Sequence, residues 1–291
     1  MNRFEIINNV IVSFLGFDDS DNKTILLIPE GPTEIQKIDK SGDFKCEDIN
    51  TIVIPKTINH ISKNAFKGFK NITKIQCYSD AFVVENHCLL SKDKKTLYLV
   101  ERAFDGTINL PSELAYICDE CFINCQKLRS LIIPDGVIYI GTSCFERCRH
   151  LESITLPKYL KCINDRTFHF CDSLREITIP SLVTKIKENA FSDCYSLKKV
   201  DIQSNKIVEV GNYCFEECQK LTRIDFLDGV KKIGDYCFAG CKALTEVSLP
   251  NTVLKIGKNA FESCNHLTVF SQSDYVKQYC NALNIVFDNN N

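Results

Sequence analysis

Apolar side chains recur along the second half of the chain with a period of about 23 residues. In each unit a cysteine follows a phenylalanine after three residues, and a leucine follows the cysteine after three more. A fixed period of this length indicates a solenoid, in which each unit forms one coil and packs against its neighbours. The phenylalanine column consists of Phe122, Phe145, Phe168, Phe191, Phe215, Phe238 and Phe261, with steps of 23, 23, 23, 24, 23 and 23 residues.

The residues after the leucine alternate between apolar and polar, as in "LRSLIIP" from Leu128 to Pro134. A period of two predicts a short strand with one buried face. The closing proline cannot donate a ladder hydrogen bond, so it marks a corner of the coil. A second apolar pair, such as Leu160 and Ile163, and a polar turn then lead to the next phenylalanine.

The earlier part of the chain follows the same pattern with an insertion. "TIVIPKTINHISKNAFKGF" keeps the register at Phe66, with Phe69 in place of the cysteine. From Phe66 to Phe122 there are 56 residues, one period of 23 plus 33 more, and these predict an inserted hairpin at about 79–106 around the polar turn "SKDKK". The chain is thus expected to divide into an N-terminal cap with a hairpin and a degenerate first repeat (1–48), a solenoid (49–270), and a C-terminal cap with a polar tail (271–291).

The unit "CxxLxxITIPxxVxxIxxxAF" resembles the Treponema-type, or BspA-like, leucine-rich repeat over roughly residues 28 to 287. This resemblance implies an α/β solenoid: a β-rich leucine-rich-repeat horseshoe with a parallel sheet on its concave face, short helical turns on the other side, and capped ends. It also implies a non-enzymatic recognition or adhesion role, in proteins of bacteria and parasitic protists that are often exposed at the cell surface.

Composition narrows the function classes. The chain is 44% hydrophobic and 25% charged, with a net charge of −2, so it has no basic excess to neutralise nucleic-acid phosphates. It contains no uninterrupted apolar run of about 18 to 20 residues, so no membrane insertion is expected. The apolar run near the N-terminus is interrupted by polar residues and shows no cleavage pattern, which predicts a cytoplasmic protein, with the cell surface as the alternative.

Seventeen cysteines raise the question of a metal site. The recurring pairs, such as Cys121 with Cys125, have CxxxC spacing instead of the CxxC spacing of common zinc sites, and Thr167 and Ala190 fill the first position in two other units. The column therefore favours small buried side chains, with occasional disulfides and a metal site as the alternatives. We expect no metal and no other cofactor.

No constellation for catalysis stands out. GxSxG, HExxH and Gly-rich phosphate loops are absent from the sequence, so an enzyme is not predicted. The histidines fall at different positions of the repeat, and no carboxylate or cysteine partner across coils is expected for them; they are His60, His87, His150, His169 and His266.

The outward side chains of the predicted strands are the candidate binding residues. Alternation places them on the open face of the sheet, where solenoids bind partners, although a merely solvated face is the alternative. Two of these outward residues, Val53 and Ile132, are apolar, and apolar residues on a polar face can mark contact with a partner. We predict that the later coils form a cross-strand ladder of alternating charge, and the chosen residues are Glu176, Thr178, Lys199, Asp201, Arg223, Asp225, Glu246 and Ser248.

The sequence therefore predicts a scaffold that binds a protein partner or associates with itself. An exported adhesin that binds host or matrix ligands is the alternative.

Overall fold

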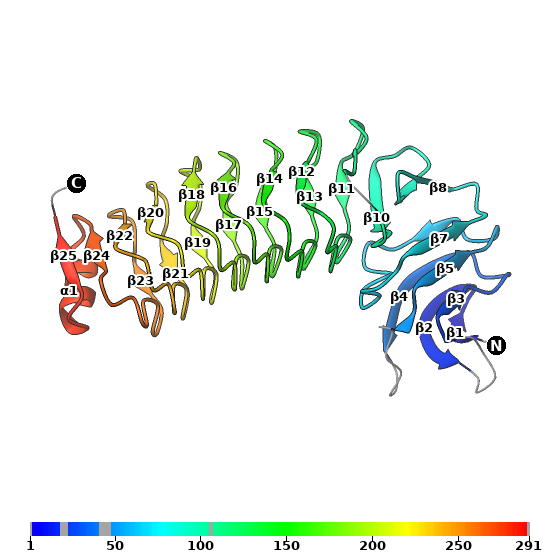
Figure 1. Cartoon of the computed structure of the whole chain (residues 1–291), viewed down its shortest axis with the longest axis horizontal. Coiled ribbons are helices and arrows are strands. Elements are labelled where there is room, and N and C mark those ends of the chain that lie inside the picture. The colour runs from blue at the N-terminus through cyan, green and yellow to red at the C-terminus, as the bar shows by residue number, and fades with distance from the viewer. Residues whose placement is uncertain (1, 18–22, 41–47, 105–106, 290–291) are drawn as a thin grey trace.

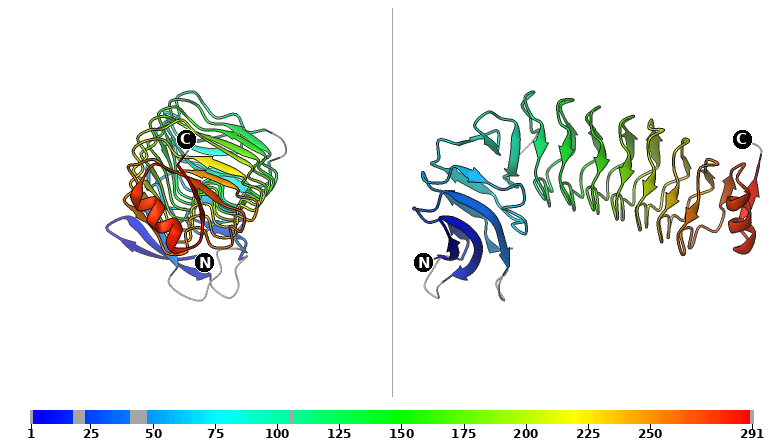
Figure 2. Two further views of the ribbon diagram at one scale, coloured as in Figure 1. Left: turned by 90° about the vertical axis from the view of Figure 1, so that its left-hand side faces the viewer. Right: turned by 180° about the vertical axis from the view of Figure 1, so that it is seen from behind.

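A computed structural model describes residues 2–17, 23–40, 48–104 and 107–289, and the chain forms an elongated solenoid (Figure 1). Seen along its axis, the coils superpose as nested outlines, with the C-terminal helix lying along one side of the end (Figure 2). The predicted repeat thus forms stacked coils of parallel strands.

Each regular coil contributes one longer strand. These strands pair in parallel, and β16 to β24 continue into the last strand of the chain, β25 (Val286–Asp288), as one sheet. Within them buried and outward residues alternate, as the period of two predicts. The longer strands are β12 (Ser130–Ile132), β14 (Ser153–Thr155), β16 (Glu176–Ile179), β18 (Lys199–Ile202), β20 (Arg223–Asp225), β22 (Glu246–Ser248) and β24 (Thr268–Phe270).

A row of shorter parallel strands runs along another side of the coils. Its first two strands continue the sheet of the insertion, and the other five form a separate sheet. Each of these strands has two residues, with the isoleucine or valine buried and its neighbour turned outward. The sequence predicted a parallel sheet on one side of the coils only, and this row was not predicted. The strands are β11 (Tyr116–Ile117), β13 (Tyr139–Ile140), β15 (Cys162–Ile163), β17 (Lys185–Ile186), β19 (Glu209–Val210), β21 (Lys232–Ile233) and β23 (Lys255–Ile256).

The segments that carry the phenylalanines form turns, not the expected short helices. Two residues four apart, such as Ser143 and Arg147, have φ of 53° and 61°. In addition, the N–H groups of Ser143, Phe145 and Arg147 donate to carbonyls of the next coil at 2.9, 2.9 and 2.7 Å. An α-helix needs those donors internally, so the inter-coil bonds exclude it. We call this array, which runs from residues 120–124 to residues 259–263, the turn ladder.

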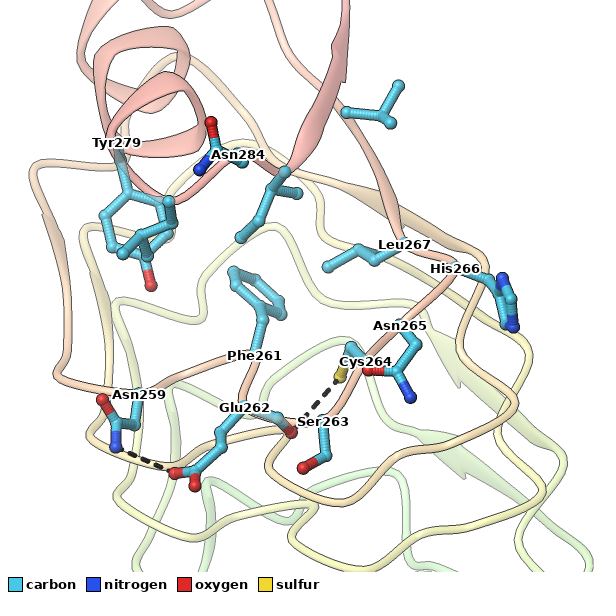
Figure 3. A pocket seen from close by; sticks show the side chains of 13 residues that line it. Asn259, Phe261, Glu262, Ser263, Cys264, Asn265, His266, Leu267, Tyr279 and Asn284 are labelled. Carbon is cyan, nitrogen blue, oxygen red and sulfur yellow. Dashed lines mark hydrogen bonds between the residues drawn. The ribbon is translucent and has the colours of Figure 1, made fainter.

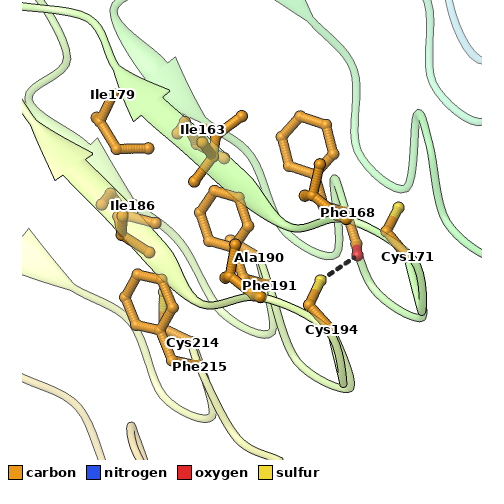
Figure 4. Close-up of a cluster of buried hydrophobic side chains, with 14 of the residues drawn as sticks. Ile163, Phe168, Cys171, Ile179, Ile186, Ala190, Phe191, Cys194, Cys214 and Phe215 are labelled. Carbon is orange, nitrogen blue, oxygen red and sulfur yellow. Dashed lines mark hydrogen bonds between the residues drawn. The ribbon is translucent and has the colours of Figure 1, made fainter. Parts of the chain in front are cut away.

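The phenylalanine column forms the centre of the solenoid core. From Phe122 to Phe261 the rings stack with centroids 5.0 to 5.4 Å apart, and Figure 4 shows three of them. The cysteine column lies beside it and is buried, with free thiols, except for the half-buried Cys264 at its end. The thiol of Cys194, for example, donates to the Phe168 carbonyl of the preceding coil at 3.1 Å. The cysteines are therefore small core residues that also satisfy a backbone acceptor.

The N-terminal part has its own core. Strands β1 and β2 form an antiparallel hairpin, and the following strands pair in parallel in two small sheets. The bounds are β1 (Asn2–Ile7), β2 (Val10–Phe17), β3 (Ile25–Leu27), β4 (Glu34–Lys40), β5 (Thr51–Ile54), β6 (His60–Ile61) and β7 (Lys74–Cys77).

The insertion forms three antiparallel strands, where the sequence predicted two: β8 (Phe82–Glu85), β9 (Cys88–Ser91) and β10 (Thr96–Val100). Asn86 and His87, with φ of 48° and 66°, make a two-residue turn that splits the first predicted strand. Leu89 and Leu99 pack in the N-terminal core, whereas Leu90 packs in the solenoid core. The insertion therefore separates the two cores and is apolar on both faces.

Two buried charged residues lie where the turn ladder begins. The Arg102 guanidinium donates to the Cys121 carbonyl at 2.7 Å, at the position that accepts a phenylalanine N–H in later coils. It also donates to the Glu120 carbonyl at 3.2 Å. The Glu120 carboxylate in turn accepts from the Gly68 N–H at 2.8 Å. The Arg102 side chain thus replaces backbone donors that a regular preceding coil would supply, and the Glu120 carboxylate provides an acceptor for the Gly68 N–H.

The C-terminal end is covered by α1 (Asp274–Ala282), which buries Val276 and Cys280, and by β25. The Ser273 side chain accepts from the Val276 N–H at the start of this helix. The division at residues 48 and 270 stays a prediction.

Candidate binding face

All eight predicted site residues lie on one face of one sheet, on β16, β18, β20 and β22. Five of them are exposed and three are half-buried. The residues between them, such as Ile177, Val200 and Val247, are buried in the core, which fixes the outward direction of their neighbours.

Strand register arranges these residues in two rows. Glu176 pairs with Lys199, Lys199 with Arg223, and Arg223 with Glu246. The predicted ladder of alternating sign is therefore wrong, because the two cations are neighbours across the strands. The second row consists of Thr178, Asp201, Asp225 and Ser248. Charge alternates along each central strand, and the face has a cationic centre beside an acidic one.

Ion pairs occupy only part of this face. Arg223 contacts Asp225 at 2.8 Å and Glu246 at 2.7 Å. Asp201 accepts from the Gln203 amide at 3.3 Å. Lys199 has no ion pair among the described residues. Exposed pairs contribute only about 0 to 1 kcal/mol each, so these charges are available to a partner at little cost in stability.

The face is shallowly hollowed. A depression of about 350 Å³ lies over Ser153, Glu176 and Lys199. A second, of about 550 Å³, lies beside Arg223 and includes the exposed Leu227. These hollows give polar and apolar side chains of a partner places to insert.

A cluster of one histidine and neighbouring carboxylates, centred on His169, was not predicted from the sequence. His169 lies 3.2 Å from the Asp193 carboxylate of the next coil and 3.9 Å from Glu146 of the preceding one, so the prediction that no carboxylate partners it across coils is wrong. His87 similarly contacts Glu101 at 2.7 Å. The signal was present in the spacing, because Glu146 and Asp193 each lie about one period from His169.

Local burial and charge set the acidities in this cluster. Burial alone raises the pKa of Asp193, but hydrogen bonds from His169, Tyr195 and Ser192 outweigh it, and the pKa lies below its ordinary value. Burial, together with the nearby Asp193 charge, raises the pKa of Glu216. The opposite shifts favour an ionised Asp193 facing the imidazole, which is a structural contact between coils.

In the described ranges no group of three or more histidine, cysteine or acidic side chains is placed to hold a metal ion. Over the same ranges, no helix has the length and apolarity that a membrane span requires. The binding face offers hydrogen bonds, charges and shallow apolar contacts.

The coils and their outward face define a leucine-rich-repeat solenoid. Residues 15–96, 103–221 and 190–286 match the BspA type leucine rich repeat region, in 6 copies. These segments span most of the chain, and the chain belongs to this family, as the repeat motif predicted. The family has a non-enzymatic repeat-protein fold, and leucine-rich-repeat proteins are typically protein-interaction scaffolds.

Solved structures share the fold. A leucine-rich repeat protein from Bacteroides ovatus has a TM-score of 0.58 and 22% identity, over 94% of this chain and 70% of that one. A T. pallidum leucine-rich repeat protein has a TM-score of 0.52 and 25% identity, over 71% and 94%. A pneumococcal vaccine antigen has a TM-score of 0.51 and 15% identity, over 97% and 95%. No curated protein matches the chain.

Proposed function

We propose that this chain is a non-enzymatic scaffold that binds a protein partner, or a second copy of itself, through the outward face of β16 to β22. The adjacent cations Lys199 and Arg223, each followed by an acid two residues further along its strand, are the observation that carries this proposal; the acids are Asp201 and Asp225. A partner with a carboxylate over the first pair and a cation over the second matches this pattern. Such complementarity contributes specificity more than raw affinity.

Charge reversal tests the face. Lys199→Glu and Arg223→Glu each place a carboxylate among existing acids, so both should abolish capture of the partner that the wild-type chain retains from the source cell. Lys255→Glu on β23 is the matched control, because it makes the same charge change at an exposed position of the other sheet and should leave capture intact. Light scattering on the same proteins measures self-association.

Retention of the captured partner by both reversals would reject this face as the binding surface. Loss with all three variants, including the control, would indicate a non-specific charge effect, and it would equally contradict the proposal.

The proposed location is the cytoplasm, and a surface adhesin is the second candidate. Labelling of native protein on intact and permeabilised source cells separates the two. Labelling only after permeabilisation supports the cytoplasmic proposal, whereas labelling of intact cells favours the adhesin.

A further inference from the structure

The last coil leaves one edge of the turn ladder without a following coil. In each regular junction, N–H groups at alternate residues of one coil donate to carbonyls at alternate residues of the next. The final set consists of donors Tyr236, Phe238 and Gly240 to acceptors Lys258, Ala260 and Glu262, at 2.9, 2.7 and 2.9 Å. The equivalent donors of the last coil are the N–H groups of Asn259, Phe261 and Ser263, and these three have no acceptor among the described residues.

This edge borders a cavity of about 740 Å³. Asn259, Phe261 and Ser263 lie on one side of it, while Tyr279 of α1 lies on the other (Figure 3), and Val286 of β25 also lines the cavity. Both Asn259 and Ser263 are exposed, so α1 does not cover this edge as a further coil would.

A side chain in the cavity is also unpartnered. The Tyr279 hydroxyl oxygen is buried and has no hydrogen-bond partner in the described part of the chain. Its ring meets Phe261 edge-on, at 6.3 Å and 68°, at the place where the next stacked phenylalanine would lie. A buried hydroxyl without a partner is unfavourable, so this end of the solenoid is less completely satisfied than the regular junctions.

We infer that this terminal edge binds an extended peptide segment of a partner protein. The carbonyls of alternate peptide residues accept from Asn259, Phe261 and Ser263, as the carbonyls of the next coil do at the six regular junctions. This is recognition of backbone by an unpaired row of N–H groups, as in strand addition. It lies apart from the charged face of β16 to β22 and does not depend on it.

A partner peptide fits this edge better than a second copy does. At the beginning of the turn ladder, the Cys121 carbonyl already accepts from Arg102, and the N-terminal body packs on that end (Figure 1). A second copy would therefore meet, at the start of its turn ladder, a row whose central carbonyl is already occupied.

The probe is a synthetic peptide with the sequence of residues 255–265, with serine in place of Cys264, since this segment supplies the acceptors of the last regular junction. Without peptide, the amides of Asn259, Phe261 and Ser263 should exchange hydrogen about a hundredfold faster than those of Tyr236, Phe238 and Gly240. Peptide at up to about 1 mM, the range of weak contacts, should slow these three amides. Slow exchange in the free protein, or no slowing by peptide, would overturn the inference.

Two variants at Val286 locate the contact. Val286→Trp fills the cavity mouth with a residue that strands tolerate and should weaken peptide binding about tenfold, whereas Val286→Thr keeps the shape and should leave it within about twofold. Equal binding by both variants would contradict the assignment, as would slowing of the three amides by inorganic phosphate alone, which indicates an anion site. Lys199→Glu should leave peptide binding unchanged, so failure of the charged face and failure of this edge are distinguishable.

Discussion

Residues 107–270 and residues 2–104 both stack parallel strands, but different contacts join their coils. In the first region the same stacked ring, thiol hydrogen bond and three turn bonds recur at each junction. In the second, Phe14 packs against Phe4 and Phe17 at tilted and edge-on angles. Repetition of one junction makes stability approximately a sum of equal neighbour terms, whereas the N-terminal contacts are individual.

The boundary shows what happens when the repeat is interrupted. The insertion displaces the coil that precedes residue 118, and the side chains of Arg102 and Glu120 supply the bonds that backbone groups supply elsewhere. A periodic ladder thus tolerates an insertion when long polar side chains reach the unsatisfied groups.

The largest expected effect is a difference between the two regions in their stability at alkaline pH. Burial raises the pKa of Cys118 and Cys264 to about 12, while an unfolded thiol titrates at about 8.5. The folded state holds these protons to higher pH, so their stabilising effect is complete below about pH 8.5 and is lost as pH rises toward 12. Between these two pH values, each such thiol lowers the free energy of unfolding by about 1.4 kcal/mol per pH unit.

Burial raises the pKa of twelve of the fourteen described cysteines in residues 107–289, whereas in residues 2–104 it does so for the two described there, Cys77 and Cys88. Since domain stabilities are about 5 to 15 kcal/mol, we expect the regular coils to unfold first between about pH 9 and 11. Hydrogen exchange by mass spectrometry, followed peptide by peptide across this range, checks the order. Simultaneous opening of both regions would show that the thiols do not determine the order of unfolding.

Emptying the aromatic column should have the next largest effect. Phe168→Ala removes a fully buried ring stacked on both sides and should lower the free energy of unfolding by about 3 to 5 kcal/mol. Phe168→Leu keeps most of the volume and serves as the control, with an expected loss below about 1.5 kcal/mol. Denaturant melting measures both, and an alanine loss below about 1 kcal/mol would reject the stacked column.

The boundary itself is tested at Arg102. Arg102→Met keeps the long apolar stem but removes the guanidinium, which leaves the carbonyls of Cys121 and Glu120 without this donor. We expect the free energy of unfolding to fall by about 2 to 4 kcal/mol. Urea melting should then resolve two transitions, since the variant weakens the contact between the regions. Arg102→Lys should lose less, because it keeps a charged donor without the planar fork. An unchanged single transition in Arg102→Met would mean that the cores couple by apolar contact alone.

The smallest effect is expected on the charged face. Arg223→Glu breaks two exposed pairs and should change the free energy of unfolding by roughly 0.5 kcal/mol or less. Melting beside the binding assay separates a lost contact from a lost fold. A shift above about 1 kcal/mol would assign these charges to stability instead of recognition.

The spacing of residues in the sequence was enough to predict the repeat, the buried strand positions and the outward location of the eight site residues. Their columns recur because each coil meets the same environment, so Phe168 or Ile177 can be assigned to the core from spacing alone. The order of charges across the strands could also have been predicted from the sequence, since Lys199 and Arg223 each begin a strand of the same parallel register. The prediction of alternating sign failed because it compared residues along a strand with residues across strands.

Contacts between coils, which no single repeat reveals, account for the features that were not predicted. The turns that replace helices depend on N–H groups that bond to the next coil, and no pattern within one unit reveals that partner. The place of Arg102, the contact of His169 with Asp193, and the unpaired N–H row at Asn259, Phe261 and Ser263 likewise arise between coils or at their end. Local periodicity specifies which face of a residue is buried, whereas the stacking of whole coils determines which polar group each backbone donor meets.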